Sequence, residues 1–274
     1  MIDLFSLKDK VIIITGATGL LGSQHAEVVA EAGGIPVLLD LDQDRCNQLA
    51  DKLKQKYSVD AIGYKVDITK EEEIIDNLSI IKIKYKYIHA LINNAANNPK
   101  VEDSTEKAFS RLENFPTAVW NSDLAVGLSG SFLCAKHYGF LISQNPAGGT
   151  ILNISSDLGL IAPDQRLYRK AGLPEELQPV KPVTYSVVKA GLIGLTRYLA
   201  TYWADKNVRC NAICPGGIEN NQNEYFLKEV ISRIPLGRLA KKDEYKGLVL
   251  LLLSESASYL NGSIISADGG RSVW

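Results

Sequence analysis

The chain has 274 residues, 46% of them hydrophobic, and a formal net charge of −1 at pH 7. This length supports one large α/β core, and the mixed charges argue against a nucleic-acid partner or a general membrane-surface partner. No apolar run approaches the ~20 residues that span a bilayer, and the first residues lack the basic and apolar regions of a secretion signal, so we expect one cytoplasmic domain over residues 1–274 with no membrane partner.

The first predicted element is a strand in the apolar, β-branched run 10–14, which is typical of a strand buried in a parallel sheet. A glycine-rich turn follows over residues 15–22, and residues 23–32 have the composition of a helix. Glycines in such a turn let the backbone approach a pyrophosphate at the helix N-terminus. We therefore expect a dinucleotide at the glycines of this turn, which are Gly16, Gly19 and Gly22.

The next apolar strand, residues 35–39, ends in the acidic side chain of Asp40. A carboxylate at this place accepts hydrogen bonds from the adenine ribose and repels a 2′-phosphate. No Arg or Lys lies between residues 39 and 42 to offset that repulsion. The sequence therefore predicts NAD as the cofactor.

Apolar strands continue to alternate with helical stretches to the end of the chain. The expected strands cover residues 11–14, 35–39, 61–66, 88–93, 150–154, 207–213 and 263–266. This alternation predicts the α/β class, as a single-domain, doubly wound parallel sheet of the Rossmann type with about seven strands flanked by helices. Right-handed crossovers would place the cofactor at the carboxyl ends of the strands.

A tyrosine and a lysine one helical turn apart, Tyr185 and Lys189, are the strongest chemical signal. Their side chains project from the same face of a helix. A nearby positive charge stabilises a phenolate, so such a tyrosine can act as an acid or base closer to neutral pH. Ser156, at the end of the preceding strand, offers a hydroxyl that can orient a substrate alcohol or carbonyl. Taken alone, the tyrosine and lysine spacing is common on solvated helices.

Together these motifs resemble the compact, single-domain branch of the short-chain dehydrogenase/reductase family, from about residue 7 to residue 270. The resemblance implies an oxidoreductase acting on CH–OH groups, with Ser156, Tyr185 and Lys189 as catalytic residues. It also implies that the dinucleotide contacts Gly16, Thr18, Gly19, Leu20, Leu21, Gly22, Asp40, Asp67, Ile68, Asn94, Ala95, Ala96, Tyr185, Lys189, Pro215, Gly216, Ile218 and Asn220. The scattered cysteines and histidines lack metal-ligand spacing, so no metal site is expected.

Two positions depart from the family pattern. Gly127 stands where the family carries a catalytic asparagine that supports a helix kink and a water-linked proton relay, although glycine can still supply a kink and a carbonyl. The glycine turn has the spacing G-x-x-G-x-x-G, with Gly19 shifting it toward the larger, sugar-nucleotide-modifying branch of the family. The proton relay is therefore an open point, and the spacing does not by itself identify the substrate.

The segment 161–183 separates Ser156 from Tyr185 by about sixteen residues more than the family usually has. It is rich in proline and in basic side chains, and long loops in compact domains are usually functional or disordered. We interpret it as a substrate lid in preference to a surface excursion. The expected substrate contacts, in the lid and around it, are Arg166, Arg169, Lys170, Asn98, Asn221 and Gln222.

The lid and the flanking motifs are also similar to a narrower group of oxidoreductases, encoded with bacterial flagellin and surface-sugar modification pathways. That resemblance implies a hydroxyl-rich, phosphorylated or nucleotide-activated sugar as the small-molecule substrate. Family resemblance further implies a homo-oligomer, a dimer or tetramer, through long helices near 117–143 and 184–205.

The sequence thus favours reversible, NAD-dependent hydride transfer between a secondary alcohol and a ketone. A catalytically silent cofactor-binding or regulatory protein is an alternative, encouraged by Gly127 but disfavoured by the intact serine, tyrosine and lysine. A nucleotide-sugar epimerase or dehydratase is a further alternative, prompted by Gly19 and the lid. Such enzymes retain their cofactor through turnover, so net NADH production would separate them from a dehydrogenase.

Overall fold

The computed structural model describes residues 2–97 and 110–273. Within these residues, seven strands form one fully parallel sheet in the order β3-β2-β1-β4-β5-β6-β7. The strands are β1 (Val11–Thr15), β2 (Ile35–Asp40), β3 (Ile62–Lys65), β4 (Ala90–Asn93), β5 (Gly149–Ile154), β6 (Val208–Pro215) and β7 (Ile264–Ala267). Each lies at or within two residues of its predicted position.

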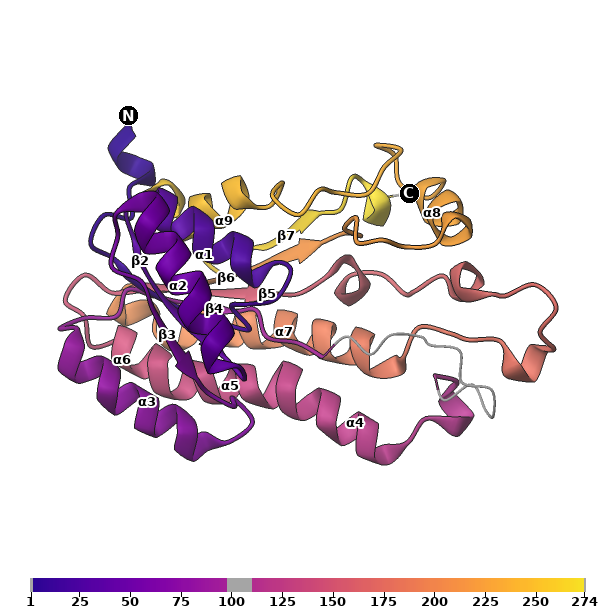
Figure 1. Ribbon diagram of the computed structural model, residues 1–274, viewed down its shortest axis with the longest axis horizontal. Coiled ribbons are helices and arrows are strands. Elements are labelled where there is room, and N and C mark those ends of the chain that lie inside the picture. Colours follow the sequence, from indigo (N-terminus) through magenta and orange to yellow (C-terminus); the bar gives the residue numbers. More distant parts are fainter. Residues whose placement is uncertain (1, 98–109, 274) are drawn as a thin grey trace.

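Helices cover both faces of the sheet, with α1, α2 and α9 on one side and α3, α5 and α7 on the other (Figure 1). Their bounds are α1 (Gly22–Glu31), α2 (Gln43–Tyr57), α3 (Glu71–Lys84), α4 (Thr117–Leu124), α5 (Gly130–Cys134), α6 (Phe140–Ile142), α7 (Val183–Tyr202), α8 (Glu224–Ile231) and α9 (Lys246–Leu253). This arrangement confirms the predicted doubly wound α/β fold. Among the described residues, no helix combines the length and apolar composition needed to cross a membrane.

The side chains of β1 explain why the sheet is buried on both faces. Successive residues of a strand point to opposite faces. Ile12 and Ile14 pack in the core beneath α1 and α9, whereas Val11 and Ile13 pack in the core beneath α3 and α7. All four are nearly fully buried, which is why the sequence shows a continuous apolar run instead of an alternating one.

The strand order reverses between β1 and β4, because the chain first runs outward through β2 and β3 and then returns beside β1. Ligands of open α/β sheets bind at the carboxyl ends of strands at such a point. The glycine-rich turn leaves β1 there, and residues 94–96 leave β4 beside it. The fold therefore brings the predicted cofactor segments to one edge of the sheet.

The helical stretch predicted over 117–143 is continuous but not uniform. It consists of α4, α5 and α6 joined by two π-helical segments, η3 (Ala125–Ser129) and η4 (Ala135–Gly139). Single π-helical turns inside α-helices are frequent at functional sites. Gly127 lies in η3, so the helix does deviate from α geometry at the residue that replaces the family's asparagine.

Candidate active site

A cavity of about 450 Å³ opens at the carboxyl edge of the sheet, beside the strand-order reversal. Of the predicted cofactor residues, all of which the structure describes, only Gly22 and Asn220 are not on its wall. The wall also contains residues that the sequence did not single out for the cofactor, which are Leu39, Leu41, Arg45, Val66, Thr69, Asn97, Val126, Ile154 and Ser155. A volume of this size is in the range of cofactor sites.

The glycine-rich turn is held tightly against the segment that leaves β4. The side-chain amide of Asn94 donates to the backbone carbonyls of Thr15 and Gly16 at 3.0 Å each. Gly16 has a φ of +61°, and a Cβ there would lie 2.8 Å from Cα of Ala95. A Cβ on Gly22 would lie 2.1 Å from the carbonyl oxygen of Gly16. These glycines therefore leave room for the turn to close and for the N-terminus of α1 to face the cavity.

Asp40, at the end of β2, also lines this cavity and already accepts three hydrogen bonds. Its Oδ2 accepts from the backbone N–H of Thr18 at 2.8 Å and from the Thr18 hydroxyl at 2.7 Å, and its Oδ1 accepts from the N–H of Leu41 at 2.8 Å. Arg45, on α2, donates to the carbonyl of Thr18 at 2.9 Å and reaches the same wall. Residues 39–42 alone did not reveal this cation, which comes from the first turns of the next helix.

These features fit a nicotinamide dinucleotide. The cavity connects the turn after β1, the acidic end of β2 and the reactive side chains on α7. Backbone N–H groups at the start of α1 suit a pyrophosphate, and Asp40 suits a ribose diol.

Lys189 and Tyr185 lie on α7 at the inner end of the cavity. Nζ of Lys189 donates to the carbonyl of Ile154 at 2.8 Å, and burial lowers the pKa of this lysine to about 8. The Tyr185 ring centroid is 5.8 Å from that nitrogen and 3.9 Å from Nζ of Lys181. Lys181 was not foreseen, although a lysine four residues before a helical tyrosine is a visible spacing.

The expected lowering of the Tyr185 pKa is not what the structure shows. Burial, the largest cause, raises the pKa of Tyr185, and a hydrogen bond with Ser156 opposes that rise. Removing water disfavours the phenolate, and Lys189, whose own pKa is lowered by burial, does not reverse the balance. The pKa of Tyr185 therefore lies above its ordinary value, and not below it as the sequence predicted.

Ser156 is buried at the end of β5, next to a carboxylate that the sequence analysis did not include. Its hydroxyl donates to Oδ1 of Asp157 at 2.8 Å, and its oxygen accepts from the N–H of Leu158 at 3.2 Å. Oδ2 of Asp157 accepts from Nη1 of Arg271 at 2.7 Å. The serine therefore lies beside a buried ion pair that joins the segment after β5 to the segment after β7.

Gly127 faces α7, where a Cβ would approach Cγ1 of Val188 to 2.4 Å. A side chain at this position would therefore require Val188 to move. The carbonyl of Gly127 accepts from the Ser131 hydroxyl at 3.0 Å. Beside it, Asp123 and Lys189 line a cavity of about 10 Å³, which is close to the size of one water.

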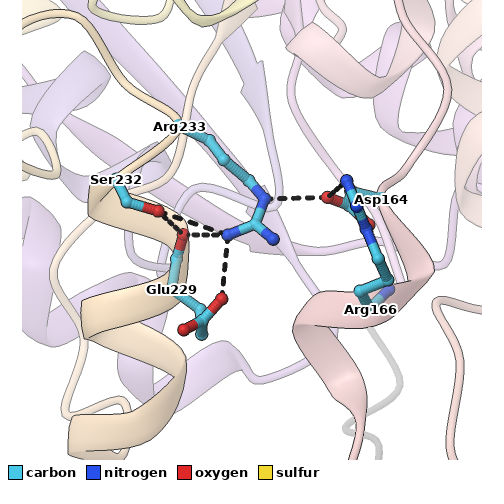
Figure 2. A network of polar contacts seen from close by, with 5 residues as sticks. All are labelled: Asp164, Arg166, Glu229, Ser232 and Arg233. Carbon is cyan, nitrogen blue, oxygen red and sulfur yellow. Dashed lines mark hydrogen bonds and ion pairs between the residues drawn. The ribbon is translucent and has the colours of Figure 1, made fainter.

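The predicted lid, residues 161–183, packs against α8 through its 3-10 turn η6 (Gln165–Tyr168) (Figure 1). Leu167 of this turn is buried against Val230 and Ile234. Asp164 accepts from Arg166 at 2.8 Å and from Arg233 at 2.7 Å, as Figure 2 shows. These two guanidinium groups hold the pKa of Asp164 well below its usual range. The segment is thus anchored by apolar packing and by ion pairs.

Most predicted substrate contacts lie away from the cavity wall. Arg166 binds Asp164, and Arg169 binds Glu175 at 3.0 Å, both with exposed guanidinium groups. The backbone N–H of Lys170 donates to Gln178. Gln222 donates to the carbonyl of Ile218 at 2.6 Å and accepts from the N–H of Asn220, next to the exposed Asn221, whereas Asn98 lies outside the described residues. Their role in binding substrate stays a prediction.

Comparisons with known proteins agree with this geometry. The model of the short chain dehydrogenase family matches residues 10–168, and that of enoyl-(acyl carrier protein) reductase matches residues 175–272. The chain is similar to 3-oxoacyl-(acyl-carrier-protein) reductase FabG of Aquifex aeolicus, with 33% identity over 96% of this chain and 98% of that protein. It is 30% identical to NAD-dependent glycerol dehydrogenase of Listeria innocua, over 98% and 96% of the two chains. The solved structure of a short-chain type dehydrogenase/reductase from Mycobacterium marinum is 26% identical in sequence. The match covers 99% of this chain and 98% of that chain, with a TM-score of 0.83.

Proposed function

This chain belongs to the short-chain dehydrogenase/reductase family, and we propose that it uses NAD(H) to interconvert a secondary alcohol and a ketone on a polyhydroxylated small molecule. Members of this family are oxidoreductases that act on CH–OH groups and bind NAD(P). The observation that carries the proposal is that Tyr185 and Lys189 line a dinucleotide-sized cavity, with the buried Ser156 directly after the wall residue Ser155. A catalytically silent binding protein has no chemical need for these three side chains together.

Each side chain has a distinct task in the proposed reaction. A nicotinamide bound here would supply the hydride chemistry, as acceptor from the carbinol carbon in one direction and as donor to the ketone in the other. Tyr185 removes or supplies the proton of the reacting oxygen. Ser156 donates a hydrogen bond to that oxygen, and Lys189 supplies positive charge near the phenol and holds the nicotinamide ribose. Ser156 and Lys189 are buried, which keeps water away from them and strengthens their electrostatic interactions.

The preference for NAD over NADP rests on Asp40. A 2′-phosphate beside this carboxylate would be repelled, and it would compete with the bonds from Thr18 and Leu41. Titration of the folded protein is therefore expected to show tighter binding of NADH than of NADPH. Asp40→Ala should narrow the difference, because the repulsion is lost while Arg45 remains at the wall.

The matched control for that titration is the double variant Asp40→Ala with Arg45→Ala. It should lose the NADPH affinity that the single variant gains, because the remaining cation is removed. Preference for NADPH in the unaltered protein would contradict both the role of Asp40 and the choice of NAD.

For the substrate, we propose a sugar phosphate or a nucleotide-activated sugar of the kind used in surface or flagellin modification. The support is the lid-like segment 161–183 together with the glycine spacing around Gly19. The similarity to a glycerol dehydrogenase supports the broader class of polyhydroxylated substrates.

A panel of polyols, hydroxy acids, sugar phosphates and nucleotide sugars, read by absorbance of NADH, tests this function. Steady NADH production on at least one member is the expected result. Conversion of a nucleotide sugar without net NADH would instead identify an epimerase or dehydratase. Binding of NADH without turnover on any class of substrate would favour the silent regulatory protein.

We also propose that the chain acts as a cytoplasmic homo-oligomer assembled through its two long helices. Large side chains on these helices are exposed, including Phe132 and Phe140 on the α4–α6 helix and Tyr198 and Tyr202 on α7. Exposed apolar surface of this kind marks association surfaces.

A further inference from the structure

We propose that Asp157 and Arg271 form a positioning pair for Ser156, in which the carboxylate holds the serine proton until the reacting oxygen of the substrate takes it. The guanidinium limits how strongly the carboxylate holds that proton. This inference rests on the proposed role of Ser156 in hydride-transfer chemistry. The pair lies outside the serine, tyrosine and lysine motif, and its two members are 114 positions apart in the chain.

The contacts of Ser156 fix its oxygen but leave its proton movable. Ser156 caps the short 3-10 turn η5 (Asp157–Gly159), where its Oγ accepts from the N–H of Leu158. Its hydroxyl donates to Oδ1 of Asp157 at 2.8 Å, which also accepts from the N–H of Leu158 at 2.8 Å. A carboxylate only accepts hydrogen bonds, so the serine is the donor. Rotation about the Cβ–Oγ bond can turn the proton toward another acceptor.

The turn that follows β7 places Arg271 next to Asp157. Asp268 shapes this turn by accepting from the N–H of Gly270 at 2.9 Å and from the N–H of Ser272 at 2.8 Å. Gly270 has a φ of +89°, which glycine adopts readily. The side chains of Asp157 and Arg271 are only 4% and 10% exposed. Each side chain of the pair is therefore held in place by its own backbone segment, η5 for Asp157 and the turn after β7 for Arg271.

The energetics of a buried ion pair argue for a role beyond stability. Desolvation of the two charges offsets much of their attraction, so such a pair contributes little net stability. Next to Ser156, however, it can govern when the hydroxyl is released. During ketone reduction the substrate oxygen gains negative charge and becomes a stronger acceptor than the paired carboxylate. The serine bond is then made mainly in the transition state, where it accelerates the reaction.

The pair also places charge beside Tyr185 and so affects the pKa of that phenol. A pair with a purely structural role would leave this pKa unchanged, so the pKa serves as the readout. Burial raises the pKa of Tyr185, a hydrogen bond with Ser156 lowers it, and the charge of Asp157 raises it further. Neutralising Asp157 should therefore lower this pKa, and removing the countercharge of Arg271 should raise it. In the part of the chain that the structure describes, the titratable groups around Tyr185 also include Lys181, Lys189, Tyr168 and Asp123.

The experiment is an ultraviolet titration of tyrosinate in the full-length protein, with the curve of Tyr185→Phe subtracted to isolate Tyr185. We expect Asp157→Asn to move the midpoint down, and Arg271→Gln to move it up, by about one pH unit each. The double variant carries a neutral amide pair and should return close to the unaltered midpoint. Arg271→Lys keeps the charge and serves as the matched control, with no displacement expected.

The proposal is overturned if Asp157→Asn and Arg271→Gln move the Tyr185 midpoint in the same direction. It is also overturned if the midpoint stays unmoved in variants that still melt cooperatively and bind NADH. Asp157→Asn is nearly isosteric with the unaltered protein. If Arg271→Gln does not fold, the titration of Asp157→Asn alone therefore decides whether the midpoint of Tyr185 moves in the expected direction. The titration needs no substrate. Failure of the proposed function appears as absent turnover in the unaltered protein, whereas failure of the positioning pair appears as an unmoved midpoint. Once a substrate is known, the pH profile of kcat/KM should move in the same directions.

Discussion

Tyr185→Phe is expected to lower turnover by about 10²–10⁴-fold while NADH binding persists. The substitution removes only the ionisable hydroxyl, and the ring keeps its place at the inner end of the cavity. The reacting oxygen then has no adjacent acid or base, although Ser156 and Lys189 remain. Turnover is measured by NADH absorbance, and cofactor affinity by NADH fluorescence on the same protein preparation.

Tyr198→Phe is the matched control for this experiment, because Tyr198 lies on the same helix, α7, but is 61% exposed. It should retain near-normal turnover. Near-normal turnover in Tyr185→Phe would mean that another group transfers the proton. Loss of NADH binding in that variant would mean that the ring shapes the cofactor cavity, and the loss of turnover could not then be assigned to proton transfer.

The parts of the fold that could be predicted are those in which the surrounding structure dictates the type of residue in a short stretch of sequence. The run 11–14 is continuously apolar because β1 is buried on both faces, and that pattern can be recognised without coordinates. The cofactor turn was predictable for a similar reason. Gly16 and Gly22 stand where a Cβ would collide with neighbouring backbone, so the geometry of the turn requires glycine at these positions.

The parts of the site that the sequence did not reveal depend on distant pairing. Asp157 follows Ser156 directly, yet its significance comes from Arg271, which β7 and its turn bring across from the other end of the chain. Arg45 reaches the cofactor cavity only because α2 begins beside the glycine turn. No local pattern marks these partners, since long basic side chains at such positions are usually solvated.

The direction of the Tyr185 pKa shift shows a different limit of sequence reasoning. The spacing of Tyr185 and Lys189 correctly indicates a shared helix, α7. It contains no information on burial, which here raises the pKa of the phenol and lowers that of the lysine. Residue spacing identifies which groups can interact, but the balance of desolvation and charge depends on the surrounding packing.

Shortening the outer part of the predicted lid is expected to lower activity steeply on the true substrate and to leave NADH affinity nearly unchanged. The structure indicates where to cut. Gln178 bonds to both the N–H and the carbonyl of Lys170, so replacing residues 171–177 by two glycines joins ends that already lie together. Combining this cut with Arg169→Gln and Lys170→Gln also removes the two predicted substrate contacts beside it. The anchor formed by Leu167 and by Asp164 with Arg233 stays intact, and α8 keeps its packing.

The expected losses differ between substrates because remote contacts position the reacting carbon and raise kcat as well as affinity. A phosphorylated or nucleotide-linked sugar should lose ~100-fold or more, whereas a small unphosphorylated alcohol, which cannot reach the segment, should lose little. The control is Glu175→Gln, which breaks the ion pair with Arg169 but leaves the length of the segment and its basic side chains unchanged, and it should keep near-normal activity. Equal losses on both kinds of substrate, or a collapse of NADH binding, would show that residues 169–177 support the fold instead of the substrate. Contacts beyond the reacting centre can discriminate only between ligands that extend to them.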